Sequence, residues 1–181
     1  MMTTLGWDIG GVNTKVACVR GGRLEQAWSQ PFEIQRDPSA LAGLLRTLAA
    51  RCADAGPVRH AVTMTAELSQ AFRTKREGVG AVLDAVGAAF GTAPVHVYGV
   101  DGRFRDPGTA RGEPFTVAAA NWAATARLVA RWHPTALVVD VGSTTTDVVP
   151  LLDGRLAALG TTDPERLASG ELIYTGMVRT A

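Results

Sequence analysis

The sequence predicts an α/β protein in which a mixed β-sheet is covered by helices on both faces. One observation is a seventeen-residue segment that occurs twice, and another is the alternation of helix-like and strand-like segments between the two copies. With 46% hydrophobic and 19% charged residues, the chain has the composition of an ordinary globular protein. Its formal net charge of +1 favours neither a nucleic-acid partner nor a membrane partner.

The repeated segment covers residues 8–24 and again 140–156. DIGGVNTKVACVRGGRL and DVGSTTTDVVPLLDGRL align without gaps, and seven of the seventeen positions are identical. Each copy predicts a β-hairpin whose first strand ends at an aspartate and is followed by a tight, small-residue turn. The second strand is expected over 15–20 or 147–152, and a Gly-Gly or Asp-Gly turn leads to a third strand. Two such tips, each with a carboxylate, predict two facing halves of one site.

The segments between the copies alternate in type. Asp37 is a suitable N-cap and Pro38 a suitable first residue for a helix with apolar residues at helical spacing. The expected order is a helix over 37–56, a strand over 58–65, a helix over 77–90, a strand over 94–99, a loop over 101–112, a helix over 115–131 and a strand from 135.

Cys18 and Cys52 lie in apolar surroundings in the sequence, which favours reduced core residues over a disulfide. The N-terminal MMTTLGWDIGG lacks the basic and apolar regions of a signal peptide. No apolar run approaches the roughly 20 residues of a membrane-spanning helix. We therefore expect a cytoplasmic protein with no membrane or nucleic-acid partner.

Each hairpin tip has the residue types of a phosphate site. Successive backbone N–H groups in a small-residue turn bind anions, hydroxyl groups add donors, and an aspartate can hold Mg²⁺ directly or through water. A tight turn with hydrogen-bonding side chains is the simpler alternative for either tip alone. The predicted phosphate-binding residues at the tips are Gly10, Gly11, Asn13, Thr14, Lys15, Gly142, Ser143, Thr144, Thr145 and Thr146. The accompanying carboxylates are Asp8, Asp140 and Asp147, with Asp8 and Asp140 as the predicted metal ligands.

The order of three hairpin strands, helix, strand and helix resembles the βββαβα plan of the actin-like ATPase superfamily, which is related to ribonuclease H. The motifs DIGGVNTK, TMTAELSQAFRTKREGV, AAANWAA, DVGSTTTDVVPL and SGELIYTGMVRTA are spread over residues 8–181. Together they resemble hydantoinase A/oxoprolinase-related proteins of tetrahydromethanopterin-linked one-carbon metabolism, a group that includes methanofuran-biosynthesis aryl-ether synthases. The resemblance implies a ribonuclease H-like domain over 1–134 and an incomplete, duplicated second domain over 135–181.

The resemblance also implies a reaction in which a phenol oxygen displaces diphosphate from an aminomethylfuran diphosphate with the help of Mg²⁺. A small phosphorylated molecule is the implied substrate. Arg73, Lys75 and Arg76 would then clamp phosphate oxygens, although a solvated basic turn explains them equally well. Glu67 would serve either as a base or as a carboxylate favoured at a helix start, and the second reading is slightly preferred.

Two alternatives to this reaction remain. Hydantoinase and oxoprolinase relatives imply ATP-assisted or metal-assisted hydrolysis of a cyclic amide, so the use of ATP is left open. A non-catalytic nucleotide-binding fragment is the other alternative. The adenosine-binding motif of ATP-using relatives lies late in their second domain, so we expect residues 1–181 alone to bind diphosphate weakly at most. The sequence gives no oligomeric state.

Overall fold

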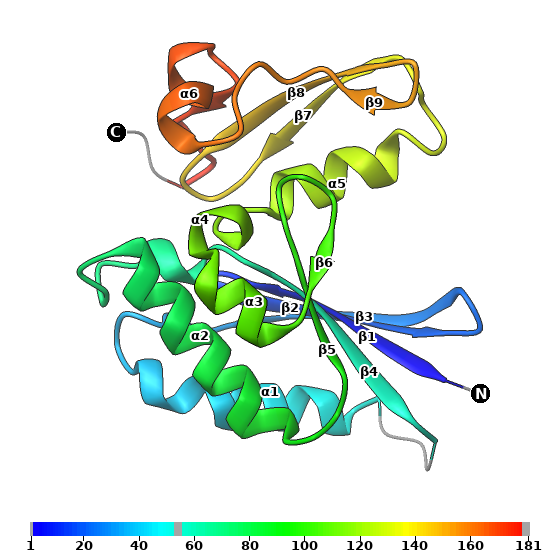
Figure 1. Ribbon diagram of the computed structural model, residues 1–181, viewed down its shortest axis with the longest axis vertical. Coiled ribbons are helices and arrows are strands. Elements are labelled where there is room, and N and C mark those ends of the chain that lie inside the picture. The colour runs from blue at the N-terminus through cyan, green and yellow to red at the C-terminus, as the bar shows by residue number, and fades with distance from the viewer. Residues whose placement is uncertain (1, 53–55, 179–181) are drawn as a thin grey trace. The chain divides into compact units, whose positions relative to one another are not determined.

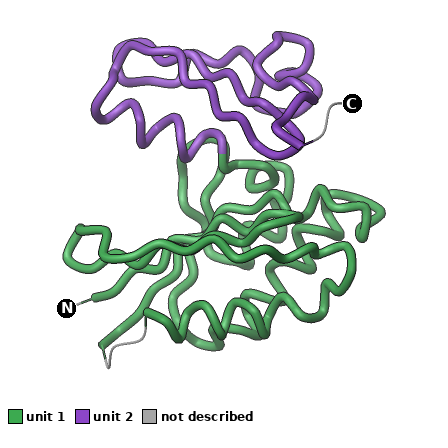
Figure 2. Tube along the Cα trace, turned by 180° about the vertical axis from the view of Figure 1, so that it is seen from behind, with its two compact units in different colours: residues 1–121 green, residues 122–181 purple. Residues whose placement is uncertain are grey.

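The computed structural model describes residues 2–52 and 56–178 (Figure 1). The chain divides into two compact units, residues 1–121 and 122–181 (Figure 2). The predicted domain boundary at 134/135 stays a prediction.

The first unit is built on a six-stranded mixed sheet in the order β3-β2-β1-β4-β5-β6. β1 pairs antiparallel with β2 and parallel with β4, as the βββαβα plan requires. Its strands are β1 (Thr3–Ile9), β2 (Asn13–Arg20), β3 (Arg23–Pro31), β4 (Val58–Met64), β5 (Val95–Tyr98) and β6 (Phe104–Arg105). Its helices are η1 (Pro38–Ala40), α1 (Leu41–Ala50), η2 (Ala66–Leu68), α2 (Lys75–Phe90), α3 (Pro107–Gly112) and α4 (Pro114–Val117).

The core of the first unit lies on one face of this sheet. Alternate residues of β1 are fully buried, and α1 and α2, which contact each other, contribute their apolar stripes to the same cluster. The cluster includes Leu5, Trp7, Ile9, Leu41, Leu45, Leu48, Val79, Val82 and Val86. The residues of β1 on its opposite face are half-buried. The predicted helix start is also present, because the Asp37 side chain accepts a hydrogen bond from the Ser39 N–H at 3.0 Å.

Two segments differ from the sequence prediction. The loop expected over 101–112 contains β6 and α3. The single helix expected over 115–131 is wrong, because α4 ends at Val117 and α5 (Asn121–Val129) begins after a break. At this break Ala119 has a φ of 50°, and its N–H donates to Glu67 Oε1 at 2.8 Å. The Ala119 N–H therefore makes a tertiary hydrogen bond to Glu67 in place of the intrahelical hydrogen bond that a continuous helix would have.

The second unit contains a four-stranded sheet with the path β10-β8-β7, and β9 pairs with β8. Its elements are α5, β7 (Ala136–Val141), β8 (Thr146–Leu152), β9 (Arg155–Leu156), α6 (Asp163–Ala168) and β10 (Leu172–Ile173). Alternate residues of β7 are exposed, so this sheet has one largely open face in the described residues.

The third strand of the hairpin differs between the two copies. In the first copy β3 pairs with β2 along its whole length. In the second copy β9 pairs only with the end of β8, through Leu151 and Leu152. Residues 158–170 then leave the sheet, and β10 returns to pair with Asp147 and Thr146 at the start of β8. β9 and β10 together thus take the place that β3 has in the first copy.

Both predicted hairpin turns have the expected backbone. Gly21 and Gly22 have φ values of 57° and 79°, and Asp153 and Gly154 have φ values of 50° and 75°. Two successive residues with positive φ match the right-handed twist of the flanking strands. The glycines and the aspartate at these positions therefore suit the two turns.

The two cysteines are free and buried, as expected. Burial, together with the neighbouring Cys18 side chain, raises the pKa of Cys52 to about 12. Cys52 therefore stays a neutral thiol in the core.

His60 makes folding of the first unit sensitive to acid. Its ring stacks on Phe90 with centroids 3.6 Å apart and accepts a hydrogen bond from Trp7 Nε1 at 3.1 Å. Burial lowers the pKa of His60 to about 4. Because an unfolded histidine titrates near 6.5, stability is fully present above about pH 6.5 and is lost as pH falls toward 4, by roughly 3 kcal/mol in total.

We expect His60→Gln, which keeps an acceptor for Trp7, to show a smaller loss of unfolding free energy between pH 6.5 and 4 than the unmodified protein. Urea titrations at several pH values measure this difference. His133→Gln is the matched control, since His133 is exposed. An equal acid dependence in His60→Gln would exclude His60 as the cause.

Candidate phosphate-binding tips

The first tip is a tight turn between β1 and β2. The Gly10 N–H donates to the Asn13 carbonyl at 2.9 Å. A Cβ on residue 10 would lie 2.6 Å from that carbonyl oxygen, so only glycine fits this turn. The turn is held beside the segment after β4, because the Thr65 N–H donates to the Ile9 carbonyl at 2.9 Å.

The charge at the first tip is balanced across the two strands. Asp8 lies opposite Lys15 in the ladder, and Lys15 Nζ contacts Asp8 Oδ2 at 3.0 Å. The other carboxylate oxygen, Oδ1, is buried without a hydrogen-bond partner among the described residues, and so is Thr14 Oγ1. Buried acceptors without donors are rare in proteins. The first tip therefore leaves one carboxylate oxygen of Asp8 unsatisfied within the described residues.

The second tip repeats this geometry. The Gly142 N–H donates to the Thr145 carbonyl at 2.8 Å. In the ladder, Asp140 lies opposite Asp147 and Val141 opposite Thr146. These pairs correspond to Asp8–Lys15 and Ile9–Thr14 in the first copy. The prediction that the two copies form equivalent hairpins, with Asp8 and Asp140 at equivalent strand ends, is confirmed by this register.

The charge at the second tip is balanced differently. Arg166 from α6 donates to Asp147 Oδ1 at 2.7 Å. This guanidinium is 1% exposed, donates to the Glu171 carbonyl at 2.9 Å and lies 3.9 Å over the Trp122 ring. Burial raises the pKa of Asp147, Arg166 opposes the shift, and Asp140 adds to it. Arg166 therefore compensates Asp147, whereas Asp140 has no ion pair within the described part of the chain.

Both tips present backbone donors without acceptors. The N–H groups of Gly11 and Val12, and those of Ser143 and Thr144, make no hydrogen bond within residues 2–52 and 56–178. No residue of either turn has a positive φ, so these donors lie in ordinary right-handed or extended backbone. Two adjacent N–H groups with no protein acceptor are available to an anion such as phosphate.

The predicted basic cluster lies at the start of α2. The side chain of Thr74 caps the helix at the Glu77 N–H, and the Glu77 carboxylate accepts from the Arg73 N–H at 3.0 Å. Arg73 and Arg76 are exposed, and the Arg76 guanidinium lies 5.8 Å from the centre of the Phe115 ring. Lys75 is the first residue of α2. These contacts favour a solvated helix start, and a phosphate-clamping role for the three residues stays a prediction.

Glu67 lies in η2 and is 2% exposed. Its hydrogen bond to the Ala119 N–H fixes the break between α4 and α5. Its backbone also lies against α2, since a Cβ on Gly78 would come within 2.5 Å of the Glu67 carbonyl oxygen. The geometry supports a structural role for Glu67, and its role as a base stays a prediction.

The protein ligands for a metal ion would be few. No group of three or more histidine, cysteine, aspartate or glutamate side chains is placed to hold a metal among the described residues. Mg²⁺ often uses one or two carboxylates, with water and phosphate oxygens completing its shell. The carboxylates of Asp8 and Asp140 fit that role, and Asp140 fits it better because Lys15 already contacts Asp8.

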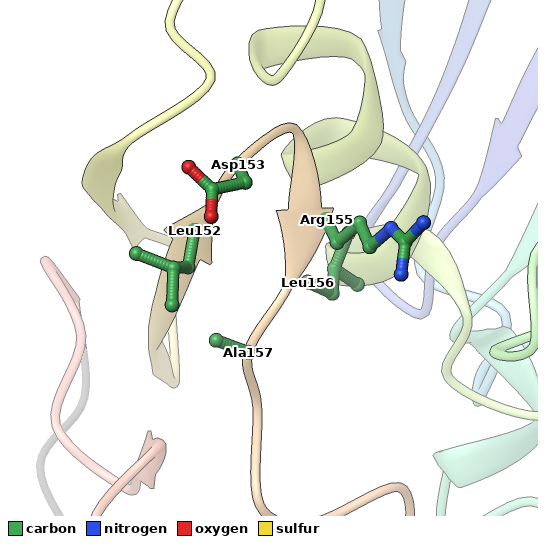
Figure 3. Close-up of a pocket in the computed structure, with 5 residues that line it drawn as sticks. All are labelled: Leu152, Asp153, Arg155, Leu156 and Ala157. Carbon is green, nitrogen blue, oxygen red and sulfur yellow. The ribbon is translucent and has the colours of Figure 1, made fainter.

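A surface hollow lies at the turn between β8 and β9 (Figure 3). Its lining residues are Leu152, Asp153, Arg155, Leu156 and Ala157. None of them is a predicted site residue, and the hollow is open and formed by one hairpin end. The chemistry of the tips therefore locates the candidate site better than the shape of this hollow does.

The mixed sheet, its βββαβα order and the repeated aspartate tips define an α/β protein of the actin-like ATPase fold. A solved structure with this arrangement is the ethanolamine utilization protein EutJ from Carboxydothermus hydrogenoformans, with a TM-score of 0.51 at 14% identity. The match covers 86% of this chain and 50% of that one, and at this identity it shows the fold alone.

The chain belongs to the hydantoinase/oxoprolinase family, whose model matches residues 59–180. It is 37% identical, over 97% of its length, to the (4-{4-[2-(gamma-L-glutamylamino)ethyl]phenoxymethyl}furan-2-yl)methanamine synthase of Methanocaldococcus jannaschii. A synthase of the same name from Methanococcus vannielii is 54% identical over 44 residues. The chain spans 51% of the first relative and 19% of the second. No helix in the described residues is long and apolar enough to cross a membrane.

Proposed function

We propose that this chain is part of a transferase that joins a phenol to an aminomethylfuran diphosphate and releases diphosphate. The observation that carries the proposal is the duplicated tip, with adjacent free N–H donors and an aspartate at each copy. The similarity to a furan methanamine synthase supports the substrate class, because the name of that relative describes a phenoxymethyl link to a furan.

In the proposed reaction the phenol oxygen forms a bond to the methylene carbon of the furan, and the bond from that carbon to the diphosphate oxygen breaks. The phenol proton leaves to a base or to water. The N–H groups of Ser143 and Thr144 would donate to diphosphate oxygens. Bound Mg²⁺ would neutralise the charge of the leaving diphosphate, and Asp140 would hold it.

An ATP-assisted or metal-assisted hydrolase of cyclic amides is the second candidate. The observation that favours it is the family match itself, which is to hydantoinases and oxoprolinases. In that reaction the same tips would bind the phosphates of a nucleotide, and its terminal phosphoryl group would be transferred to drive ring opening. The two candidates therefore differ in whether nucleotide is consumed.

The deciding experiment omits nucleotide. The protein is incubated with Mg²⁺, the furan diphosphate and glutamyl-tyramine, and ether product and pyrophosphate are measured. We expect both to appear in equal amounts without ATP, because the substrate already carries the activated bond. If no ether forms without ATP, and the protein instead opens a cyclic amide while ADP accumulates, the hydrolase candidate replaces the transferase.

A further inference from the structure

The segment after β10 is bonded to the second tip through two hydrogen bonds. The Met177 N–H donates to the Gly142 carbonyl at 2.9 Å, and the Val178 N–H donates to the Ser143 carbonyl at 3.0 Å. Thr146 Oγ1 also donates to the Thr175 carbonyl at 2.6 Å. Residues 175–178, called the strap below, thus occupy one side of the turn.

These two hydrogen bonds fix the direction of the tip donors. The Gly142 carbonyl and the Ser143 N–H belong to one peptide unit, and the Ser143 carbonyl and the Thr144 N–H to the next. In a trans peptide the C=O and N–H bonds point in opposite directions, and no described peptide bond is cis. Because both carbonyls point toward the strap, both N–H groups point away from it and lie on the same side of the turn.

Gly176 allows the strap to approach this closely. A Cβ on residue 176 would lie 2.5 Å from both the Ser143 carbonyl carbon and the Thr144 nitrogen. These are backbone atoms, so a side chain there would have to displace the turn. The side chain of Met177, in contrast, is 81% exposed. The backbone of the strap, and not its side chains, therefore makes the contact.

The first tip has a strap of different origin. There the Phe32 N–H donates to the Val12 carbonyl at 2.8 Å and the Ile34 N–H to the Gly11 carbonyl at 3.1 Å. This segment follows β3 directly and runs in the opposite sense along its turn, whereas the strap of the second tip follows the separate strand β10. Two unlike segments thus hold two successive carbonyls in each tip, but the held positions are shifted by one residue between the aligned copies. At the first tip only one of the two free donors, the Val12 N–H, belongs to a peptide unit that is held in this way.

We infer that residues 175–178 are positioning residues for anion binding: by holding the Gly142 and Ser143 carbonyls, they align the Ser143 and Thr144 N–H groups toward one phosphate group. This inference rests on the proposed phosphate-binding role of the tips. It assigns a function to the TGMV segment that none of the predicted site residues covers. Met177 and Gly176 act through the backbone of the turn and do not touch the phosphate.

The test compares Met177→Pro with Met177→Ala. Proline removes the N–H that donates to Gly142, whereas alanine keeps it and changes only an exposed side chain. Affinity for inorganic pyrophosphate is measured by calorimetry, and the ¹H–¹⁵N signals of Ser143 and Thr144 are followed during the titration. We expect Met177→Pro to bind about tenfold more weakly, a change of about 1.4 kcal/mol, and Met177→Ala to match the unmodified protein.

Gly176→Ala is the second variant and should weaken binding in the same way. Near-ultraviolet circular dichroism identifies variants that keep their fold. Folded Met177→Pro and Gly176→Ala with unchanged affinity would overturn the inference while leaving the proposed function in place. A further test uses the unmodified protein. If pyrophosphate binds but the ¹H–¹⁵N signals of Ser143 and Thr144 do not change, the inference is also overturned. No pyrophosphate binding even at high pyrophosphate concentration with Mg²⁺ present would instead contradict the proposed function.

Discussion

Replacing Arg166 by methionine is expected to lower the free energy of unfolding by about 3–5 kcal/mol at neutral pH, because it leaves a largely buried carboxylate without its counter-ion. Arg166 is 1% exposed and Asp147 13% exposed. The substitution also removes the contact with the Trp122 ring and the donor to Glu171. Urea unfolding followed by circular dichroism measures the change.

The loss in Arg166→Met should depend on pH. Burial already raises the pKa of Asp147 above its usual value, and removing Arg166 raises this pKa further. A carboxyl group whose pKa is raised by folding costs stability in full above its folded pKa, and the cost shrinks as pH falls from there to the unfolded value of about 3.9. The deficit relative to the unmodified protein should therefore be largest near pH 7 and smaller near pH 4.

The double variant Asp147→Asn, Arg166→Met is the control for the buried charge. It should be more stable at pH 7 than Arg166→Met alone, because no charged carboxylate is then buried without a partner. If Arg166→Met unfolds within about 0.5 kcal/mol of the unmodified protein, the level of an ordinary surface substitution, the ion pair does not stabilise the second unit.

Asp140→Asn is expected to weaken pyrophosphate binding in the presence of Mg²⁺ by about 100-fold, or about 2.7 kcal/mol. Asparagine keeps the size of the side chain but removes the charge that would hold the cation. Within the described residues Asp140 has no ion pair of its own, so this effect does not come from a lost salt bridge. Calorimetry with and without Mg²⁺ is the measurement, and the two proteins should differ less without the metal.

Asp153→Asn is the matched control for Asp140→Asn. Asp153 lies at the other end of the same hairpin, where its φ of 50° suits asparagine as well as aspartate. It should bind pyrophosphate as the unmodified protein does. Equal affinities for Asp140→Asn and Asp153→Asn would remove Asp140 from the site.

The repeat made the tips predictable, because the spacing of aspartate, glycine and threonine is local information. The register confirms that Asp8 and Asp140 occupy equivalent places. The insertion between β9 and β10 was not predictable from the alignment of the copies, which ends at residue 156. The sequence prediction also missed the break at Ala119, because a distant carboxylate, Glu67, determines it.

Arg166 and Gly176 were missed for a related reason. Arg166 lies in DPERLASG, which has the charged composition of an exposed helix start, and nothing in that pattern indicates a guanidinium buried over Trp122. The contact with Asp147 arises only when residues 157–171 fold back on β8. Gly176 could have been noticed in the sequence, because a glycine near a strand often marks a place where two backbones approach each other closely.

In the second hairpin copy, β9 and β10 share the place that β3 has in the first copy. This arrangement affects the tendency of the protein to self-associate. An incompletely paired outer edge can recruit a strand from another molecule and start aggregation. On β8 the Pro150 carbonyl accepts from Ala157 and the Val148 N–H donates to Glu171, so little of the ladder remains open between β9 and β10. The remaining backbone N–H on this edge of β8 would belong to residue 150. Residue 150 is a proline and therefore has no N–H. A proline that interrupts an apolar strand thus closes this edge to intermolecular β-pairing.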